Sequence, residues 1–177
     1  MSLLSERAGR ISDARRVPEN ERLDRLAREA EFGRRRMVPK VDTYLSFDGT
    51  AAQAMRFYEQ SLGARLDVLM KFGDAQNRER VPPGSNDKVM HAQLSFESGD
   101  RLMASDWIGG QPYEGMKGFS VALSYETASE ARTAFEALVK GGMTILPMQQ
   151  SFFAEAFGML IDRFGTPWTI SAATRQS

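Results

Sequence analysis

The chain of 177 residues is long enough to bury a core of its own, and 42% hydrophobic with 26% charged residues is typical of a globular domain. Lysine and arginine balance aspartate and glutamate at 23 each, which argues against general binding to nucleic acid or to acidic membrane surfaces. The absence of cysteine excludes disulfides, thiolate nucleophiles and thiolate metal sites.

Residues 1–37 differ in composition from the rest of the chain. They hold ten arginines against seven acidic residues, and from Pro18 onward leucines and alanines recur with helical spacing. We therefore predict a polar, arginine-rich and partly helical extension, followed by a domain over residues 38–177. The segment lacks the apolar core of a secretory signal, and no run approaches the roughly 20 apolar residues that span a bilayer, so we expect a cytoplasmic protein.

The first predicted unit of the domain is a strand followed by a helix. Residues 41–47 are rich in strand-forming side chains and end at a turn signal, Asp48-Gly49. Thr50 with Gln53 three residues later predicts a capping box at the start of a helix, and Gly63 predicts its end.

The same pattern returns later in the chain. Residues 117–125 predict a strand, and Thr127 with Glu130 predicts a second capping box before a helix that ends at Gly141. Matching residues lie 78 positions apart in the two copies: Ser46 and Ser124, Phe47 and Tyr125, Phe57 and Phe135, and Gly63 and Gly141. This offset indicates an internal repeat with modules at about 38–108 and 115–177.

Three strand-like runs follow each predicted helix. They cover residues 64–72, 88–98 and 100–106 in the first copy, and 143–150, 155–162 and 166–173 in the second. In the second copy, the turn Asp162–Gly165 between the last two runs predicts a β-hairpin. The polar loop 73–87 accounts for the extra length of the first copy, so the domain is α+β with the order β-α-β-β-β twice.

A family resemblance is carried by three segments, YLSFDGTAAQAMRFYEQSLGARL, VMHAQLSFESGDRLMASD and FFAEAFGMLIDRFGTPWTI. Their most specific pieces are Phe57-Tyr58 with Leu62-Gly63, and Asp162–Gly165 with Trp168. Over residues 38 to about 173 the chain resembles the PhnB-like branch of the vicinal oxygen chelate superfamily, which includes glyoxalase I, bleomycin- and fosfomycin-resistance proteins and extradiol dioxygenases. The resemblance implies two tandem βαβββ modules that form a curled, half-open mixed sheet around a cavity, commonly in a homodimer.

The resemblance also predicts where a metal would bind. Metal-dependent relatives use His, Gln or Glu side chains on the first and last strands of each module. The corresponding positions here are Thr43 or Tyr44, Ala104 or Ser105, Phe119, and Thr169. Because none offers an imidazole or a carboxylate, we expect no metal site. Members are often named demethylubiquinone methyltransferases, but the sequence has no Gly-rich strand-to-helix turn for a nucleotide-like cofactor, and we expect none.

Two residues are candidates for catalysis. His91 is the only histidine and lies in an alternating strand, where it could act as a general base facing the cavity. Asp106 ends the next strand and would complete an acid–base pair. One alternative is a structural histidine. This is favoured by the apolar Phe157 at the matching position of the second copy, which lies 66 residues later because that copy lacks the first copy's extra loop. The other is an aspartate that caps the loop after its strand.

Aromatic, methionine and serine side chains near strand ends favour ligand binding, although a curled sheet also buries such residues as core. The candidates are Tyr44, Met103, Ser105, Trp107, Phe157 and Trp168. We expect a homodimeric, metal-independent protein that binds a small molecule. The alternatives are a lyase- or isomerase-type enzyme that uses His91 and Asp106, with or without a divalent metal in another geometry, and a protein-interaction module that docks a partner through the extension.

Overall fold

The computed structural model describes residues 18, 20–24, 39–74, 81 and 83–173. The chain divides into two units, Met1–Lys40 and Val41–Ser177. In the first unit, residues 20–24 are helical, and Arg22 N donates to Pro18 O at 3.1 Å. The rest of the predicted extension, including the run Arg34–Arg36, lies outside the described residues. Among the helices of the described part, none is long and apolar enough to cross a membrane.

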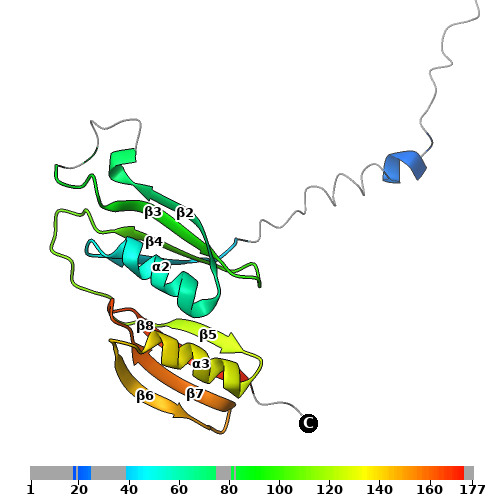
Figure 1. Ribbon diagram of the computed structural model, residues 1–177. Coiled ribbons are helices and arrows are strands. Elements are labelled where there is room, and N and C mark those ends of the chain that lie inside the picture. Colours follow the sequence, from blue (N-terminus) through cyan, green and yellow to red (C-terminus); the bar gives the residue numbers. More distant parts are fainter. Residues whose placement is uncertain (1–17, 19, 25–38, 75–80, 82, 174–177) are drawn as a thin grey trace, which may run out of the picture. The chain divides into compact units, whose positions relative to one another are not determined.

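The second unit contains two copies of one arrangement, which confirms the predicted β-α-β-β-β repeat (Figure 1). Module 1 comprises β1 (Thr43–Phe47), α2 (Ala51–Leu62), β2 (Arg65–Lys71), the 3-10 helix η1 (Phe72–Asp74), β3 (Val89–Ser95) and β4 (Arg101–Asp106). Module 2 comprises β5 (Val121–Tyr125), α3 (Ala128–Leu138), β6 (Met143–Gln149), β7 (Ala154–Ile161) and β8 (Pro167–Ala173).

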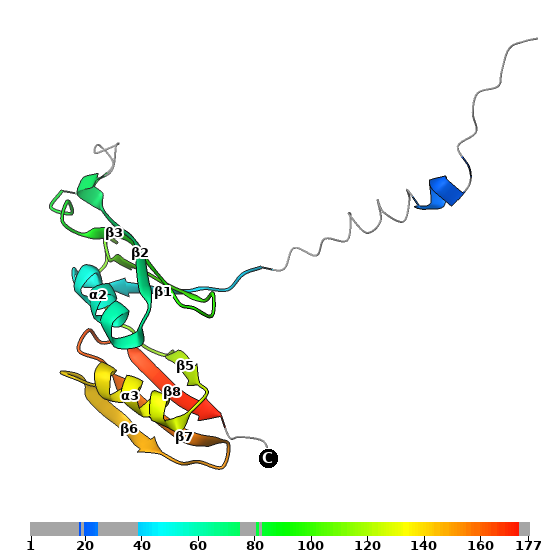
Figure 2. The same cartoon turned by 45° about the vertical axis from the view of Figure 1, so that its right-hand side comes forward.

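Each module forms a four-stranded mixed sheet with one helix on one face (Figures 1 and 2). The strand orders are β1-β4-β3-β2 and β5-β8-β7-β6. β1 runs parallel to β4 and β5 parallel to β8, whereas the remaining neighbours are antiparallel. The backbone hydrogen bonds thus form two separate four-stranded sheets. The strand pairing does not show the curled sheet that the resemblance implied.

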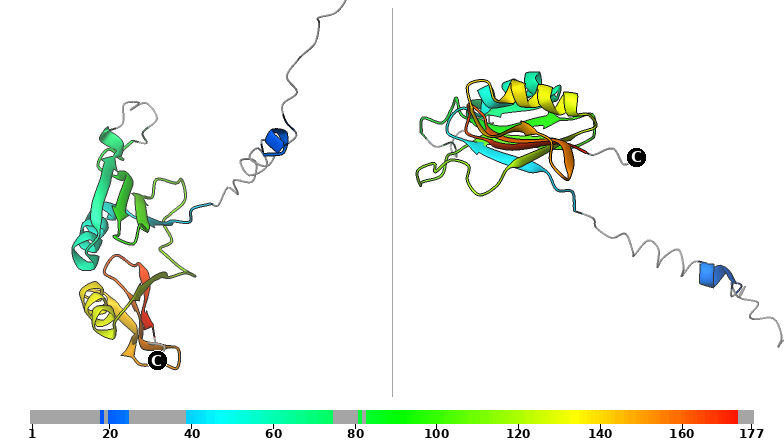
Figure 3. Two further views of the ribbon diagram at one scale, coloured as in Figure 1. Left: turned by 90° about the vertical axis from the view of Figure 1, so that its right-hand side faces the viewer. Right: turned by 90° about the horizontal axis from the view of Figure 1, so that it is seen from below.

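Side chains alternate between the two faces of the module 1 sheet. On β4, Leu102 and Ala104 are buried on the face that α2 covers, while Met103 and Ser105 are only half-buried on the other. In the left-hand view of Figure 3, α2 lies to one side of this sheet, and neither α2 nor α3 covers the opposite face. We call that opposite side the open face of module 1; Tyr44, His91, Gln93, Ser95, Met103 and Ser105 lie on it.

The two helices begin in different ways. At α3, Glu130 N donates to Thr127 Oγ1 at 3.2 Å and Thr127 N donates to Glu130 Oε2 at 3.1 Å, which confirms the predicted capping box. At α2, the side chain of Thr50 makes no capping hydrogen bond, so the predicted box with Gln53 is wrong. Asp106 of β4 takes this role instead, because its Oδ1 accepts from Ala51 N at 2.9 Å.

The hairpin turn between β7 and β8 joins the two modules. Asp162 Oδ1 accepts from Phe164 N at 2.8 Å and from Thr166 N at 3.1 Å, which shapes the turn. Asp162 Oδ2 accepts from Trp168 Nε1 at 2.8 Å and from the Tyr58 hydroxyl of α2 at 2.6 Å. The predicted hairpin is therefore confirmed, and its aspartate binds a residue of the other module.

Aromatic rings surround this hydrogen-bonded centre. Trp168 lies edge-on to Tyr58 with ring centroids 5.1 Å apart, and Phe164 lies 5.7 Å from Phe57. The Arg163 guanidinium lies 4.6 Å above the Phe57 ring. The two most specific pieces of the sequence resemblance, Phe57-Tyr58 and the Asp162–Gly165 turn, thus meet in space as a structural joint, and one hydrophobic core runs through both modules.

Candidate ligand-binding face

An aromatic pair lies on the open face of module 1. Tyr44 of β1 and His91 of β3 stack with ring centroids 6.0 Å apart and an interplanar angle of 29°. The Tyr44 hydroxyl lies 3.4 Å from His91 Nδ1, and the Tyr44 side chain remains 49% exposed. β4 runs between these two strands, and its Met103 is the register partner of Tyr44 on one side and of Gln93 on the other. Two rings and a thioether are therefore available to a flat ligand.

Asp106 does not belong to this face. Its carboxylate is 4% exposed, and its oxygens accept from Ala51 N at 2.9 Å and from Val89 N at 2.7 Å on the helix-covered side of the sheet. His91 points to the other side, toward Tyr44. The proposed His91–Asp106 acid–base pair is thus not formed, because the strand alternation places the two side chains on opposite faces.

The remaining candidates lie either on the open face or elsewhere in the two modules. Ser105 is the register partner of Ser46, and together with Met103 and Tyr44 it lies on the open face. Trp107 follows β4 and donates from Nε1 to Gln111 O at 2.7 Å, beside a hollow of about 360 Å³. Phe157 belongs to β7 of module 2, where its ring lies 5.1 Å from that of Phe153.

Trp168 is not on the open face either. It is fully buried, and Asp162 accepts a hydrogen bond from its indole N–H, so the indole is part of the joint between the modules.

A second hollow, of about 460 Å³, lies between strands β1 and β5. Its lining includes all five residues of β5, Thr43 and Arg101, and also Trp168, one of the predicted ligand-binding residues. The aromatic pair of Tyr44 and His91 does not line either hollow.

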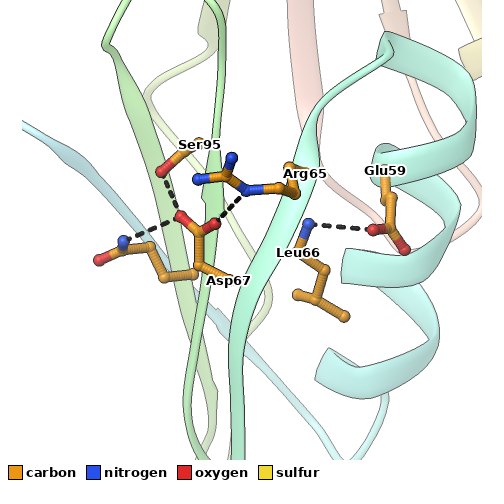
Figure 4. A network of polar contacts seen from close by, with 6 residues as sticks. Glu59, Arg65, Leu66, Asp67 and Ser95 are labelled. Carbon is orange, nitrogen blue, oxygen red and sulfur yellow. Dashed lines mark hydrogen bonds and ion pairs between the residues drawn. The ribbon is translucent and has the colours of Figure 1, made fainter.

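A polar cluster on the open face was missed by sequence reasoning. Asp67 of β2 accepts from Arg65 Nε at 2.6 Å, from Gln93 Nε2 at 3.4 Å and from the Ser95 hydroxyl (Figure 4). The hydrogen bonds from Ser95 and Arg65 hold the pKa of the Asp67 carboxyl below its ordinary value. The alternation of Arg65 and Asp67 was visible in the sequence, but their partners depend on the β2–β3 register, which no local pattern specifies.

The residues at the family's metal positions do not fit a metal ion. Tyr44 is engaged with His91, and the other positions carry hydroxyl, methyl or phenyl groups. Within the described part of the chain, no group of three or more His, Cys, Asp or Glu side chains is placed to hold an ion. We derive no metal-dependent step for this site.

Comparison with known proteins identifies the family. Residues 39–171 match the model of the 3-demethylubiquinone-9 3-methyltransferase family. The crystal structure of PA1353 from Pseudomonas aeruginosa is 38% identical with a TM-score of 0.71, and the match covers 77% of this chain and 98% of PA1353. PhnB from Bacillus cereus is 26% identical with a TM-score of 0.63 over 76% of this chain and all of its own. Protein YjdN of Escherichia coli is 28% identical over 77% of this chain and 97% of its own.

The fold has a wider set of neighbours. A glyoxalase/bleomycin resistance/dioxygenase domain from Frankia is 14% identical with a TM-score of 0.58, which shows a shared fold only. The chain therefore has the glyoxalase/bleomycin-resistance fold and belongs to the PhnB-like 3-demethylubiquinone-9 3-methyltransferase family. The resemblance stated from the sequence is confirmed.

Proposed function

We propose that this protein binds a small organic molecule on the open face of module 1 without the help of a metal ion. The supporting observation is the stacked pair of Tyr44 and His91, in which Tyr44 stays half-exposed next to its register partner Met103. Contiguous exposed apolar groups, unlike single ones, mark surfaces that bind a ligand or a partner. Methyl transfer, which the family name describes, is not part of the proposal, because the sequence lacks the Gly-rich turn of a nucleotide-like cofactor site.

A second copy of the chain is the proposed cover for this face. Large apolar side chains on both modules remain 42–56% exposed, namely Met70, Tyr44, Phe119, Ile145 and Met143. Ligand cavities enclose most of the surface of a small molecule, which one flat sheet cannot do alone. A homodimer would bury these apolar groups and enclose the ligand at the same time.

The proposal can be tested with a neutral flat probe, biphenyl-4-carboxamide, titrated into the ¹⁵N-labelled protein. We expect saturable shifts at the amides of Tyr44, His91 and Met103. Tyr44→Ala should weaken binding about tenfold, because it removes one of the two rings. Ile108→Ala removes another exposed apolar side chain, outside the sheet, and should leave the affinity unchanged. Shifts confined to other residues, or equal affinities for the two variants, would contradict the proposal.

Size-exclusion chromatography with light scattering tests the dimer. We expect the unmodified protein to have the mass of two chains. Met143→Glu puts a charge on the exposed apolar surface, so the measured mass of this variant should fall toward that of one chain. A single-chain mass for the unmodified protein at micromolar concentration would refute the dimer. It would leave the binding face itself to the probe titration.

A further inference from the structure

The polar cluster at one end of the open face presents a guanidinium outward. Arg65 donates to Asp67 through Nε only, and its side chain is 80% exposed. Within the described residues, no protein acceptor binds its two terminal nitrogens. Figure 4 shows Arg65, Asp67 and Ser95 on the side of β2 away from α2. Asp67 thus holds the guanidinium through Nε, while Nη1 and Nη2 remain available to a ligand.

The carboxylate in this cluster is directed inward and is already used. The Asp67 side chain is 21% exposed, and it accepts from three side chains, those of Arg65, Gln93 and Ser95. A cationic ligand would have to displace these donors to reach it. An anionic group, in contrast, would meet unpaired N–H donors whose orientation Asp67 fixes in advance.

The cluster and the aromatic pair lie at a distance that one small molecule can span. Ser95 is the register partner of Arg65, and His91 lies four residues away on the same strand, which is about 13 Å at 3.3 Å per residue. Gln93 occupies the position between them and bonds to Asp67, and its register partner Met103 lies beside Tyr44. The open face is thus polar at one end and aromatic at the other.

We propose that the ligand of this face is an aromatic carboxylate, with its carboxylate held by Nη1 and Nη2 of Arg65 and its ring against Tyr44 and His91. The inference rests on the proposed function, because it names the ligand class of the same face. A planar carboxylate matches the two parallel donors of a guanidinium fork, which a lysine cannot offer.

Biphenyl-4-carboxylate and biphenyl-4-carboxamide form the matched pair of probes, with affinities measured by NMR titration. We expect the carboxylate to bind about tenfold more tightly than the amide. Arg65→Gln should abolish this preference, so that the carboxylate binds no more tightly than the amide. Arg65→Lys should restore only part of it, since a lysine keeps the charge but lacks the fork. Arg56→Gln, an exposed arginine of α2, should retain the full preference.

The outcomes separate the two proposals. Equal affinities for both probes, or a preference that survives Arg65→Gln, would overturn the carboxylate assignment and leave the binding face intact. Binding of neither probe to the open face would overturn the proposed function and the assignment with it. Because Arg65 is exposed, we expect an unchanged thermal midpoint for its variants, so that a change in affinity reports on binding.

Discussion

The Tyr58 hydroxyl of α2 donates a 2.6 Å hydrogen bond to Asp162 Oδ2 in the β7–β8 turn, across 104 positions of sequence. Thr166 Oγ1 lies 2.8 Å from the same hydroxyl, and the Trp168 indole donates to the same carboxylate oxygen. All four side chains are buried. The modules of this duplicated fold are therefore joined by a polar centre inside an aromatic cluster.

Tyr58→Phe should destabilise the protein by about 1–3 kcal/mol, because Asp162 loses a buried donor while the ring packing stays in place. Urea unfolding monitored by tryptophan fluorescence measures this difference. Tyr125→Phe is the control, since Tyr125 is half-buried and its hydroxyl has no hydrogen-bond partner among the described residues. Similar losses for the two variants would show that the Tyr58–Asp162 bond adds no stability of its own.

The difference in free energy of unfolding between the unmodified protein and Tyr58→Phe should shrink in alkaline solution. Burial, and after it the charge of Asp162, raises the pKa of the Tyr58 phenol well above its ordinary value of 10.0. A group with a raised folded pKa stabilises the fold fully below its unfolded pKa and loses that contribution as the pH rises above it. Urea unfolding of both proteins at pH 8 and pH 10.5 tests this. An unchanged difference between them would mean that Tyr58 ionises as readily in the folded protein as in the unfolded chain.

A threonine-to-alanine substitution should cost more stability at the start of α3 than at the start of α2. Thr127→Ala should cost about 1 kcal/mol, because Thr127 accepts from Glu130 N, whereas Thr50→Ala should change stability by less than about 0.5 kcal/mol. Asp106→Ala should cost about 2–4 kcal/mol, since it leaves the N–H groups of Ala51 and Val89 without their acceptor. Thermal or urea unfolding ranks the three variants. A larger loss at Thr50 than at Thr127 would contradict the assignment of Asp106 as the α2 cap.

Gly142 should not tolerate a side chain. A Cβ at this position would lie 2.8 Å from Asp162 Cα and would also clash with the Ile161 carbonyl, so the joint turn would have to shift. We expect Gly142→Ala to cost more than about 2 kcal/mol. Gly110→Ala, where no atom lies within 4 Å of the added Cβ, should be near neutral in the same urea unfolding experiment. Equal changes in the free energy of unfolding for Gly142→Ala and Gly110→Ala would show that the turn can shift without destabilising the protein.

Local signals in the chain are enough to predict the helices, the strands and their duplication. Strand alternation, helical spacing and glycine positions are local signals, so the two βαβββ modules, the hairpin at Asp162–Gly165 and the capping box at Thr127 were predicted and are confirmed. The family followed from short motifs, and the match over residues 39–171 confirms it.

Which side chains meet depends on how the strands and modules pair in three dimensions. Asp106 was predicted as a partner of His91, but the sheet directs it to the start of α2, where it replaces the cap expected from Thr50. Trp168, a predicted ligand-binding residue, lines the hollow of about 460 Å³, but its indole N–H is bound by Asp162 and its ring packs on Tyr58 in the joint. The Arg65–Asp67–Ser95 cluster was not predicted. In each case the contact depends on sheet register or module docking, which brings distant positions together and leaves no periodic trace in the chain.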